Sequence, residues 1–408
     1  MLDIQISDTK GARPRATGRS AVAAVTLGIF TVMTAELLPV GLLTPAAADL
    51  GVSEGTAALM VTVPGLVAAL AAPLVTARAA GADRRTLLVA FLLLAAAANL
   101  VSALAGHLAT VLAARVLLGV AIGGFWALAG GLAPRLVPSA AVGRATALIF
   151  GGVSAASVLG VPAATLVTEQ AGWRWAFAAT GALGLLAALA LRALLPRLPG
   201  TGTRAALETS GATGGGLRKL LALPRRNRRV RAGLLLTLTL VTGHFLAYSF
   251  VRPLLTDHSK IPAPLLGALL LGYGVAGVAG NFLAGARAAR SPRRTLTAIA
   301  AALGAVLLAA FLAGDSAPAG TGLLLLWGLA HGGVSVALQS WFMAAAPDDV
   351  ETATGLNVSV FCLAIALGAL LGGLLADAYS LTSVLLAGAA LALAACPVAA
   401  LSGRNDQP

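Results

Sequence analysis

Two charged side chains stand inside long apolar runs of the sequence, Glu36 in the first run and Arg115 in the fourth. A charge at membrane depth costs a few kcal/mol even on the most lenient scale, so such a residue is usually paired or functional. Apolar surroundings favour the neutral carboxylic acid, whereas a nearby guanidinium favours the carboxylate. We therefore predict that Glu36 takes up and releases a proton and that Arg115 tunes this exchange. The alternative is a permanent ion pair that locks two helices together.

Polar and aromatic side chains in the other runs are candidates for binding a small molecule, because such cavities are mostly apolar with a few convergent polar groups. His244 and His331 are expected near the centres of their runs, where a neutral imidazole can hydrogen-bond a ligand or titrate. A hydrogen bond between two helices is the alternative. Trp126 can stack on a base or a sugar face, or simply pack. The further candidates are Thr34, Tyr248, Asn281, Gln339 and Asn357.

Other familiar chemistries are not indicated. The stretch from Gly272 to Gly277 fits G-x-G-x-x-G, but it lies inside an apolar run with no strand before it. Four histidines and two cysteines provide neither metal-ligand spacing nor a disulfide framework. No G-x-x-x-x-G-K-[ST] stretch is present, which excludes ATP-driven work by this chain alone. We expect no metal, no cofactor and no enzymatic activity, with a proton gradient as the energy source.

The apolar runs that carry these side chains have the length of membrane-spanning helices. Of the 408 residues, 58% are apolar and 11% are charged, whereas about a quarter are charged in soluble domains. A bilayer-spanning helix needs about 20 apolar residues. The sequence therefore predicts an all-α membrane protein with twelve transmembrane helices. Their approximate positions are about 20–43, 56–77, 86–106, 109–133, 142–168, 174–195, 232–255, 264–286, 295–313, 320–345, 352–376 and 380–402.

The positive charges lie almost entirely on one side of these runs. The formal net charge is +13, and 24 of the 28 Lys and Arg residues fall in the tails and in the loops on the N-terminal side. Cytoplasmic loops of membrane proteins are rich in Lys and Arg. We therefore expect a bacterial cytoplasmic membrane protein with both termini inside and the anionic inner leaflet as the partner of this charge. No nucleic-acid partner is expected, and the protein is expected to be a monomer.

One segment of the sequence occurs twice. Residues 77–87 read ARAAGADRRTL and residues 286–296 read ARAARSPRRTL, with eight identical positions of eleven at an offset of 209 residues. Each copy follows the second run of its half, which indicates two pseudo-symmetric bundles of six helices around a substrate path. The expected organisation is a tail, a bundle, a cytoplasmic linker, a second bundle and a second tail, at 1–19, 20–195, 196–230, 231–402 and 403–408.

Glu36 and Arg115 fall at similar depth when the N-terminus is placed inside. Counting 1.5 Å per residue from helix midpoints near residues 32 and 121 puts Glu36 about 6 Å and Arg115 about 9 Å toward the outer side. The two side chains are therefore expected to meet in the outer half of the first bundle.

Several stretches resemble motifs of the major facilitator superfamily. They are ELLPVGLLTP (36–45), RVLLGVAIGGFW (115–126), LGVP (159–162), GWRWAF (172–177), GNFLAG (280–285) and LGALLGG (367–373). Within that superfamily the chain looks like the twelve-helix drug:proton antiporters, closest to bacterial purine-ribonucleoside exporters, with arabinose-type sugar exporters as near neighbours. The resemblance implies export of a purine nucleoside, a sugar or a drug by alternating access, coupled to proton entry. Uptake or facilitated diffusion by the same fold and a non-transporting membrane sensor are the alternatives.

The resemblance also implies residues for close packing. Gly119 belongs with Arg115 to the family's helix-4 motif, in which a bare glycine face is the simplest interpretation. Gly160 and Pro162 match the helix-5 signature of the antiporters, where bending and packing against the eighth helix are expected.

Five arginines are expected to gate the path or to anchor interfaces. Arg252 stands near the outer end of the seventh run, and two pairs belong to the repeated loops, namely Arg84 with Arg85 and Arg293 with Arg294. The family's usual loop acid is missing, because alanines occupy its positions, Ala80 and Ala289. Asp83 is the nearest acid in the first loop.

Overall fold

The structure of the chain is a computed structural model that describes residues 14–78, 82–129, 132–138, 141–199, 222–288 and 290–401. Within these residues it contains helices and no strand, and twelve helical segments are long and apolar enough to cross a membrane. The predicted all-α class with twelve spanning helices is therefore confirmed. Ala80, Ala289, much of the predicted linker, residues 1–13 of the first predicted tail and all of the second, 403–408, lie outside the described residues.

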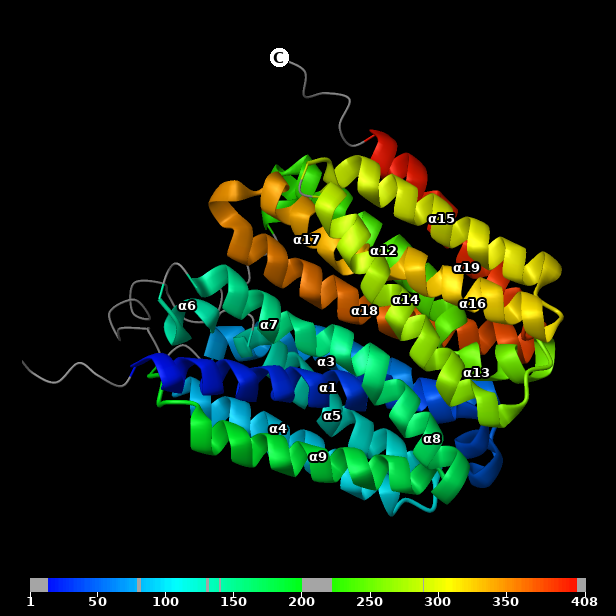
Figure 1. The fold of residues 1–408 in the computed structure, drawn as a ribbon, viewed down its shortest axis with the longest axis horizontal. Coiled ribbons are helices and arrows are strands. Elements are labelled where there is room, and N and C mark those ends of the chain that lie inside the picture. Colours follow the sequence, from blue (N-terminus) through cyan, green and yellow to red (C-terminus); the bar gives the residue numbers. More distant parts are fainter. Residues whose placement is uncertain are drawn as a thin grey trace, which may run out of the picture.

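The first six spans form one bundle, coloured from blue to green in Figure 1. A short helix, α2 (Glu54–Ala57), precedes the second span, and another, α6 (Ala133–Leu136), precedes the fifth. The spans are α1 (Pro14–Leu50), α3 (Leu59–Arg78), α4 (Arg84–Ala103), α5 (Leu108–Ala129), the continuous segment α7, η2 and α8 (Val142–Ala155, Ala156–Gly160 and Val161–Ala171), and α9 (Trp173–Leu194).

The last six spans form the second bundle, coloured from green to red in Figure 1. The first of them continues at its end into a short helix, α13 (Val251–Pro253), and a π-helical turn, η3 (Leu254–His258). The spans are α12 (Arg228–Tyr248), α14 (Leu266–Ala288), α15 (Pro292–Ala313), α16 with α17 (Ala317–Gly332 and Val334–Ala345), α18 (Val350–Ala378) and α19 (Ser383–Leu401).

The two bundles meet along two pairs of helices. α18 of the second bundle packs against α3 and α2 of the first, and α14 packs against η2 and α8. The ends of α1 and α12 also meet, through α13. In Figure 1 these contacts join the lower and upper groups of helices. The interface therefore consists of four spanning helices, α3, α8, α14 and α18, together with the end of α1.

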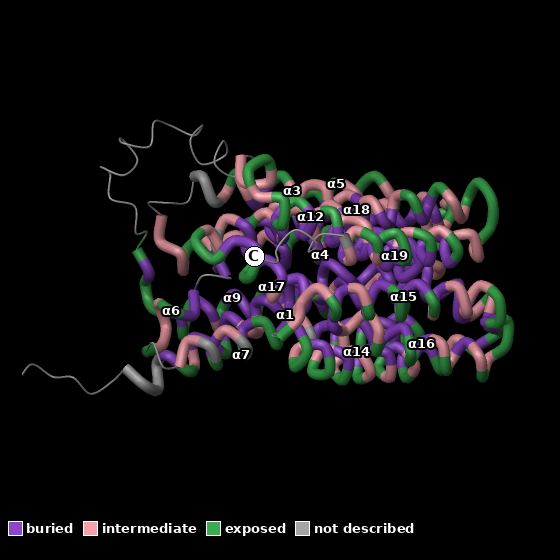
Figure 2. Tube along the Cα trace, turned by 90° about the horizontal axis from the view of Figure 1, so that it is seen from above, coloured by how far each residue is buried: buried purple, intermediate pink, exposed green. Residues whose placement is uncertain are grey.

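Burial in this protein is distributed as a membrane requires. Figure 2 shows buried residues through the interior of the helical assembly and exposed residues on its outer faces. Large apolar side chains occupy both places, because Phe125 and Phe342 are fully buried while Phe282 is 73% exposed and Leu70 is 69% exposed. An apolar side chain on an outer face is stable when lipid, rather than water, surrounds it.

Two spans are less regular than the sequence predicts. The fifth contains a π-helical turn, η2, which ends two residues before Pro162 in the first turn of α8. A proline in a helix removes one backbone donor, and a π-helical turn shifts the hydrogen-bond register around it. The tenth span is divided at Gly333 into α16 and α17. Apolar content reveals where a span lies, but it does not reveal such local changes of register.

The arginines of the repeated loops bind the last helix of their own bundle. Arg85 donates to the carbonyl oxygen of Arg192 near the end of α9, and Arg293 donates to that of Ala400 near the end of α19. The last carbonyl groups of a helix lack intrahelical donors and carry partial negative charge, which favours a cation there. In this structure the two loops are thus tied to their own bundles.

Asp83 holds the first of these loops in place. Its carboxylate accepts hydrogen bonds from the hydroxyl group of Thr86 at 2.9 Å and from the backbone amide of Leu198 at 2.7 Å. Burial alone would raise the pKa of Asp83, but these hydrogen bonds outweigh it and hold the pKa below its usual value. The contribution of the Asp83 carboxylate to the stability of the folded protein is therefore complete above the usual pKa of about 3.9. It is lost as the pH falls below that value.

Replacing this carboxylate tests the loop anchor. Asp83→Ala removes the N-cap of α4 and the acceptor for Leu198, so it is expected to lower the free energy of unfolding by about 1 kcal/mol. Thermal unfolding of the purified protein in detergent measures the change at pH 7. The difference from the unmodified protein should shrink near pH 3, and a difference independent of pH would contradict a role for the carboxylate charge.

Candidate functional site

Glu36 and Arg115 come together inside the first bundle without forming an ion pair. Both are buried, with exposed fractions of 2% and 1%. Nη1 of Arg115 donates to the backbone carbonyl of Ala35 at 3.0 Å, and its guanidinium carbon lies 4.8 Å from the ring centroid of Phe177. The two charged groups are close enough to interact electrostatically, but no nitrogen–oxygen distance between them falls within 4.0 Å.

Several polar atoms of this pair have no hydrogen-bond partner among the residues that the structure describes. They are Oε1 of Glu36 and both Nε and Nη2 of Arg115. A buried polar atom without a partner is rare and costs free energy, so each one calls for an explanation. A permanent lock would satisfy both groups mutually, which this arrangement does not. The unpartnered atoms of the pair can instead bind a proton or a ligand, or form hydrogen bonds in a different arrangement of the helices.

Thr34 lies two residues before Glu36 and also has a buried hydroxyl oxygen without a partner. It faces Gly160 of η2, where an added Cβ would lie 3.0 Å from Cγ2 of Thr34 and even closer to its hydroxyl oxygen. Gly160 itself therefore packs closely against the first helix. The turn η2 and the helix α8, which together hold Gly160 and Pro162, pack against α14, the eighth span, as expected. One close contact there is made by Val158, whose Cα would lie 2.6 Å from a Cβ added to Gly274.

Gly119 makes the close contact expected of it. A Cβ at Gly119 would lie 2.6 Å from Cβ of Val67 and 2.7 Å from the carbonyl oxygen of Pro64. The glycine thus lets α5 approach α3 closely. Arg115 lies on α5 one turn before Gly119, so this packing helps to position Arg115.

The two histidines, predicted only to share a depth, are stacked on one another. The ring centroids of His244 and His331 lie 3.3 Å apart with an interplanar angle of 6°. The indole nitrogen of Trp327 donates to Nδ1 of His244 at 3.0 Å. Because an indole N–H is only a donor, Nδ1 of His244 must be unprotonated in this arrangement. His244 thus makes the hydrogen bond between helices that was the alternative to ligand binding.

Tyrosines extend this stack. Tyr248 stacks on His244 at 4.9 Å between centroids, and Tyr273 of α14 stacks on Tyr248 at 5.0 Å. Nδ1 of His331 is buried and has no hydrogen-bond partner within the described part of the chain. Tyr273 and Trp327 were not among the residues chosen from sequence, although both are aromatic residues within apolar runs. The rings of His244, Tyr248 and Tyr273 are almost fully buried, and His331 is half-buried.

The remaining predicted ligand contacts lie apart from this cluster. Trp126 packs on Phe150, with ring centroids 5.9 Å apart, and Oδ1 of Asn357 accepts a hydrogen bond from Thr237 at 2.7 Å. Gln339 is exposed and Asn281 is half-buried. Asn281 follows Gly267 and Gly274 at seven-residue intervals on α14, and both glycines face the first bundle. Its position therefore places it on the helix face directed at the first bundle.

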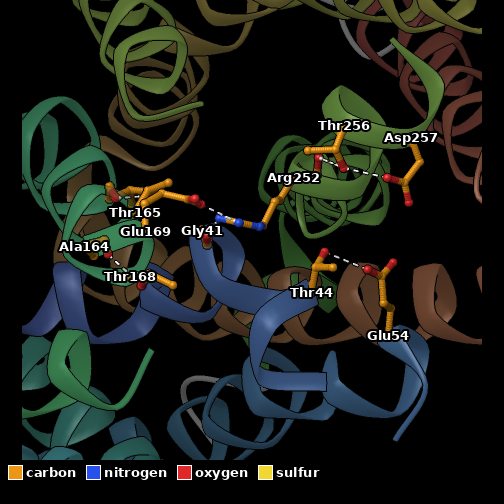
Figure 3. Close-up of polar contacts among 11 residues, drawn as sticks. Gly41, Thr44, Glu54, Ala164, Thr165, Thr168, Glu169, Arg252, Thr256 and Asp257 are labelled. Atoms are coloured by element: carbon orange, nitrogen blue, oxygen red, sulfur yellow. Dashed lines mark hydrogen bonds and ion pairs between the residues drawn. The ribbon is translucent and has the colours of Figure 1, made fainter. Parts of the chain in front are cut away.

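Arg252 bridges the two bundles near the C-terminal ends of α8 and α12. It pairs with Glu169 of α8, and its Nη1 donates to the carbonyl oxygen of Gly41 of α1 at 3.0 Å. Figure 3 shows Arg252 extending from the second bundle between these two partners of the first. The predicted position at an interface is thus the observed one. Glu169, its partner, was not chosen from sequence, although it is an acid at the end of an apolar run.

A second polar contact closes the same end. Oδ2 of Asp377, at the end of α18, accepts a hydrogen bond from the hydroxyl group of Ser53 at 2.6 Å. Oδ1 of the same carboxylate accepts one from the amide of Gly55 at 3.2 Å. Nearby, Thr44 donates to Glu54 at 2.6 Å within the first bundle, as Figure 3 shows. This end of the two bundles is therefore held together by the side chains of Glu169, Arg252, Ser53 and Asp377 and by backbone groups of Gly41 and Gly55.

Two bundles of spanning helices, joined at one end and holding buried polar groups within their core, are the architecture of a multi-pass membrane transporter. The chain belongs to the Major Facilitator Superfamily, whose sequence model matches residues 25–369 and, in a second match, residues 253–408.

Relatives of known activity cover almost the whole chain. It is 33% identical over 374 residues to the purine ribonucleoside efflux pump NepI of Escherichia coli (strain K12 / MC4100 / BW2952), which is 92% of this chain and 91% of that protein. It is also 33% identical over 367 residues to the pump of the same name from Shigella sonnei, with 90% of each chain covered.

Solved structures share the fold at low sequence identity. An inward-facing, unoccupied bacterial homologue of the human lysosomal transporter Spinster superposes with a TM-score of 0.77 at 16% identity, covering 97% of this chain and 98% of the other. The human organic anion transporter MFSD10 gives a TM-score of 0.67 at 20% identity, covering 94% and 99%. The pseudo-symmetric two-bundle fold predicted from the sequence is thereby confirmed.

Proposed function

We propose that this transporter exports a small polar or amphipathic molecule from the bacterial cytoplasm in exchange for protons, without a cofactor. The observation that carries the proposal is the buried carboxyl group of Glu36, which lies beside Arg115 with an unpartnered oxygen. Purine nucleosides are the first substrate class to test, because the relatives that cover the chain are named for their efflux. Sugars and drugs are the other classes.

The proposed cycle uses the two environments available to Glu36. Near Arg115 the carboxylate is favoured, and away from it, in apolar surroundings, the neutral acid is favoured. When the outer end opens, Glu36 is accessible from outside and takes up a proton. Return to the arrangement described above brings Glu36 back beside Arg115, and the proton leaves toward the cytoplasm. A carboxyl group that changes partners in this way couples proton entry to the movement of the bundles.

Substrate recognition is proposed for the inner faces of the second bundle. The stacked rings of His244, His331 and Tyr248, which are largely buried in this arrangement, are the proposed aromatic contacts, with Nδ1 of His331 as a hydrogen-bonding atom. A purine base suits such a surface, because it combines a flat ring with hydrogen-bonding edges. Trp126, which belongs to the first bundle, and Asn281, on the face of α14 directed at that bundle, are further proposed contacts. Thr34, Gln339 and Asn357 are proposed as further polar contacts with the substrate.

The placement in the membrane is part of the proposal. Both termini and the arginine-rich loops are on the cytoplasmic side, the excess positive charge lies at the anionic inner leaflet, and the protein acts as a monomer. Arg252 and Glu169 then belong to the gate on the outer side.

An efflux panel tests the proposal. Cells that express the chain and cells with empty vector are loaded with radiolabelled inosine, arabinose or a cationic dye, and loss of label is followed with and without an uncoupler. We expect faster loss of inosine from the expressing cells, and we expect the uncoupler to abolish the difference. Faster loss that persists after the proton gradient collapses would contradict antiport, and faster uptake would contradict the direction.

A further inference from the structure

A cavity of about 630 Å³ opens on the side of the second bundle, between α14, α15 and α16. This volume lies within the range of about 300–1,000 Å³ that ligand-binding cavities usually have. Three arginines line one end of it, Arg287 of α14, Arg290 of the following loop and Arg294 of α15. The rest is lined mainly by Gly, Ala, Leu, Ile and Val.

The cavity runs along the helices over about the depth of one leaflet. On α15 its lining extends from Ser291 to Val306, which corresponds to about 22 Å of helix at 1.5 Å per residue. A bilayer including its headgroup regions is about 40–45 Å thick, so one leaflet contributes about 20–22 Å. Leu283 and Leu326 in its wall are 53% and 52% exposed, and therefore lie open to the lipid rather than inside the bundle.

The arginine end of the cavity has unused positive charge. Arg287, Arg290 and Arg294 are all exposed, and none has a side-chain hydrogen bond or ion pair with a described residue. Arg293 of the same loop differs, because it donates to the carbonyl oxygen of Ala400. The loop also starts α15, whose N-terminus adds partial positive charge. Guanidinium groups bind phosphate with two parallel hydrogen bonds.

The matching loop of the first bundle is less basic. At the offset of 209 residues, Gly81 stands where the second loop has Arg290, and Asp83 stands where it has Pro292. Arg85, the counterpart of Arg294, donates to the carbonyl oxygen of Arg192. Compared with the first loop, the second loop therefore has one more arginine, Arg290, and lacks the acid. Its Arg294 also makes no side-chain hydrogen bond with a described residue, whereas Arg85 does. These differences favour binding of an anion at the second loop only.

We propose that this cavity binds one anionic phospholipid from the leaflet on the N-terminal side. The phosphate lies among Arg287, Arg290 and Arg294, and one acyl chain lies along the apolar wall between α14 and α15. Basic residues between spanning helices at the cytoplasmic surface are suited to such headgroups. The inference depends on the placement of the helices across the bilayer and is independent of the substrate and of proton coupling.

Lipid binding to the purified full-length protein tests the charge requirement. Native mass spectrometry in a mild detergent compares phosphatidylglycerol with phosphatidylcholine of the same acyl chains. The test variant carries Arg287→Gln, Arg290→Gln and Arg294→Gln. The control carries Arg226→Gln, Arg228→Gln and Arg231→Gln, which removes the same charge from exposed residues near the start of α12. We expect the unmodified protein to bind the first phosphatidylglycerol at least about tenfold more tightly, the test variant to lose this preference and the control to keep it.

A second variant tests the apolar part without changing the charge. Ala298→Phe places a ring in the cavity from an exposed position on α15, so folding should not depend on it. We expect it to weaken phosphatidylglycerol binding at least about tenfold, with an unchanged midpoint of thermal unfolding. Equal loss in the two arginine variants would overturn the proposal in favour of general surface attraction. Full binding by Ala298→Phe, or displacement of the lipid by millimolar inorganic phosphate, would overturn it in favour of an anion site without a lipid chain.

Discussion

Glu36→Gln is expected to reduce proton-driven efflux by more than about tenfold. Burying a charged carboxylate costs a few kcal/mol more than burying the neutral acid, and a glutamine cannot switch between these two states. Glutamine has nearly the shape of the protonated acid, so the packing of α1 is retained, but it cannot release a proton. The measurement is the rate of inosine efflux from energised cells, with the amount of protein in the membrane determined in parallel. Exchange of labelled for unlabelled inosine in the absence of a gradient should survive, since that exchange needs no net proton transfer.

Glu54→Gln is the matched control for this substitution. Glu54 is also a carboxylate of the first bundle, but it accepts a hydrogen bond from Thr44 near the outer end and has no contact with Arg115. Efflux by this variant should stay within about twofold of the unmodified protein, because a glutamine oxygen also accepts that hydrogen bond. If Glu36→Gln exported inosine at the normal rate and with the normal response to an uncoupler, another group would have to carry the proton.

Arg252→Glu is expected to open the outer end of the transporter and to stop net efflux. The substitution places two carboxylates where Arg252 now pairs with Glu169, and it removes the donor to Gly41. Breaking a largely buried ion pair costs free energy in the closed arrangement, although the partial exposure of Glu169 reduces this cost. Even the reduced cost shifts the equilibrium between closed and open outer ends toward the open state by about tenfold or more. The reversed pair, Arg252→Glu with Glu169→Arg, should recover part of the activity, since the carbonyl contact stays lost.

Cys362 provides the readout for this prediction. It is buried on α18, where its backbone carbonyl approaches Gly65 of α3 in the other bundle. In a Cys396→Ser background, an impermeant thiol reagent added outside should label Cys362 at least about tenfold faster in Arg252→Glu than in the parent. The reversed pair should return labelling toward the parent rate. Unchanged labelling in Arg252→Glu would show that this ion pair does not keep the outer end closed.

The spanning helices could be predicted from the sequence because bilayer thickness sets their length. A run of about 20 apolar residues has few other uses in a chain with so little charge. The two-bundle arrangement followed from the loop repeat at residues 77–87 and 286–296. The irregular turns did not follow, because the choice between an α-helical and a π-helical register at Ala156–Gly160 depends on how Pro162 and the neighbouring helices fit together.

The candidate site could be predicted only in part. Depth along a helix can be counted, so Glu36 and Arg115 were placed together, and the structure brings them within electrostatic range. The direction in which a side chain points around its helix cannot be obtained by counting residues. Arg115 therefore turned out to bind the carbonyl of Ala35 rather than the carboxylate beside it. The same limit hid the stacking of His244 on His331, which are 87 residues apart in the chain.

Contacts between bundles were the least predictable. Glu169 and Asp377 stand at helix ends, where acids are common, and nothing in the sequence pairs them with Arg252 or Ser53. Their partners depend on how the two bundles are placed relative to one another. That placement results from close approach at residues such as Gly65, Gly274 and Gly373, where an added Cβ would lie 3.0 Å or less from an atom of the opposite bundle.

Proton movement in proteoliposomes tests the central claim most directly. Purified protein is reconstituted into vesicles that contain inosine and a pH-sensitive dye, and the vesicles are diluted into buffer without inosine. Antiport predicts that inosine leaving the vesicles drives protons inward, so the interior becomes acidic in proportion to the inosine lost, and that Glu36→Gln abolishes the acidification. Outward flow of inosine at the same rate with no change of internal pH would contradict proton antiport.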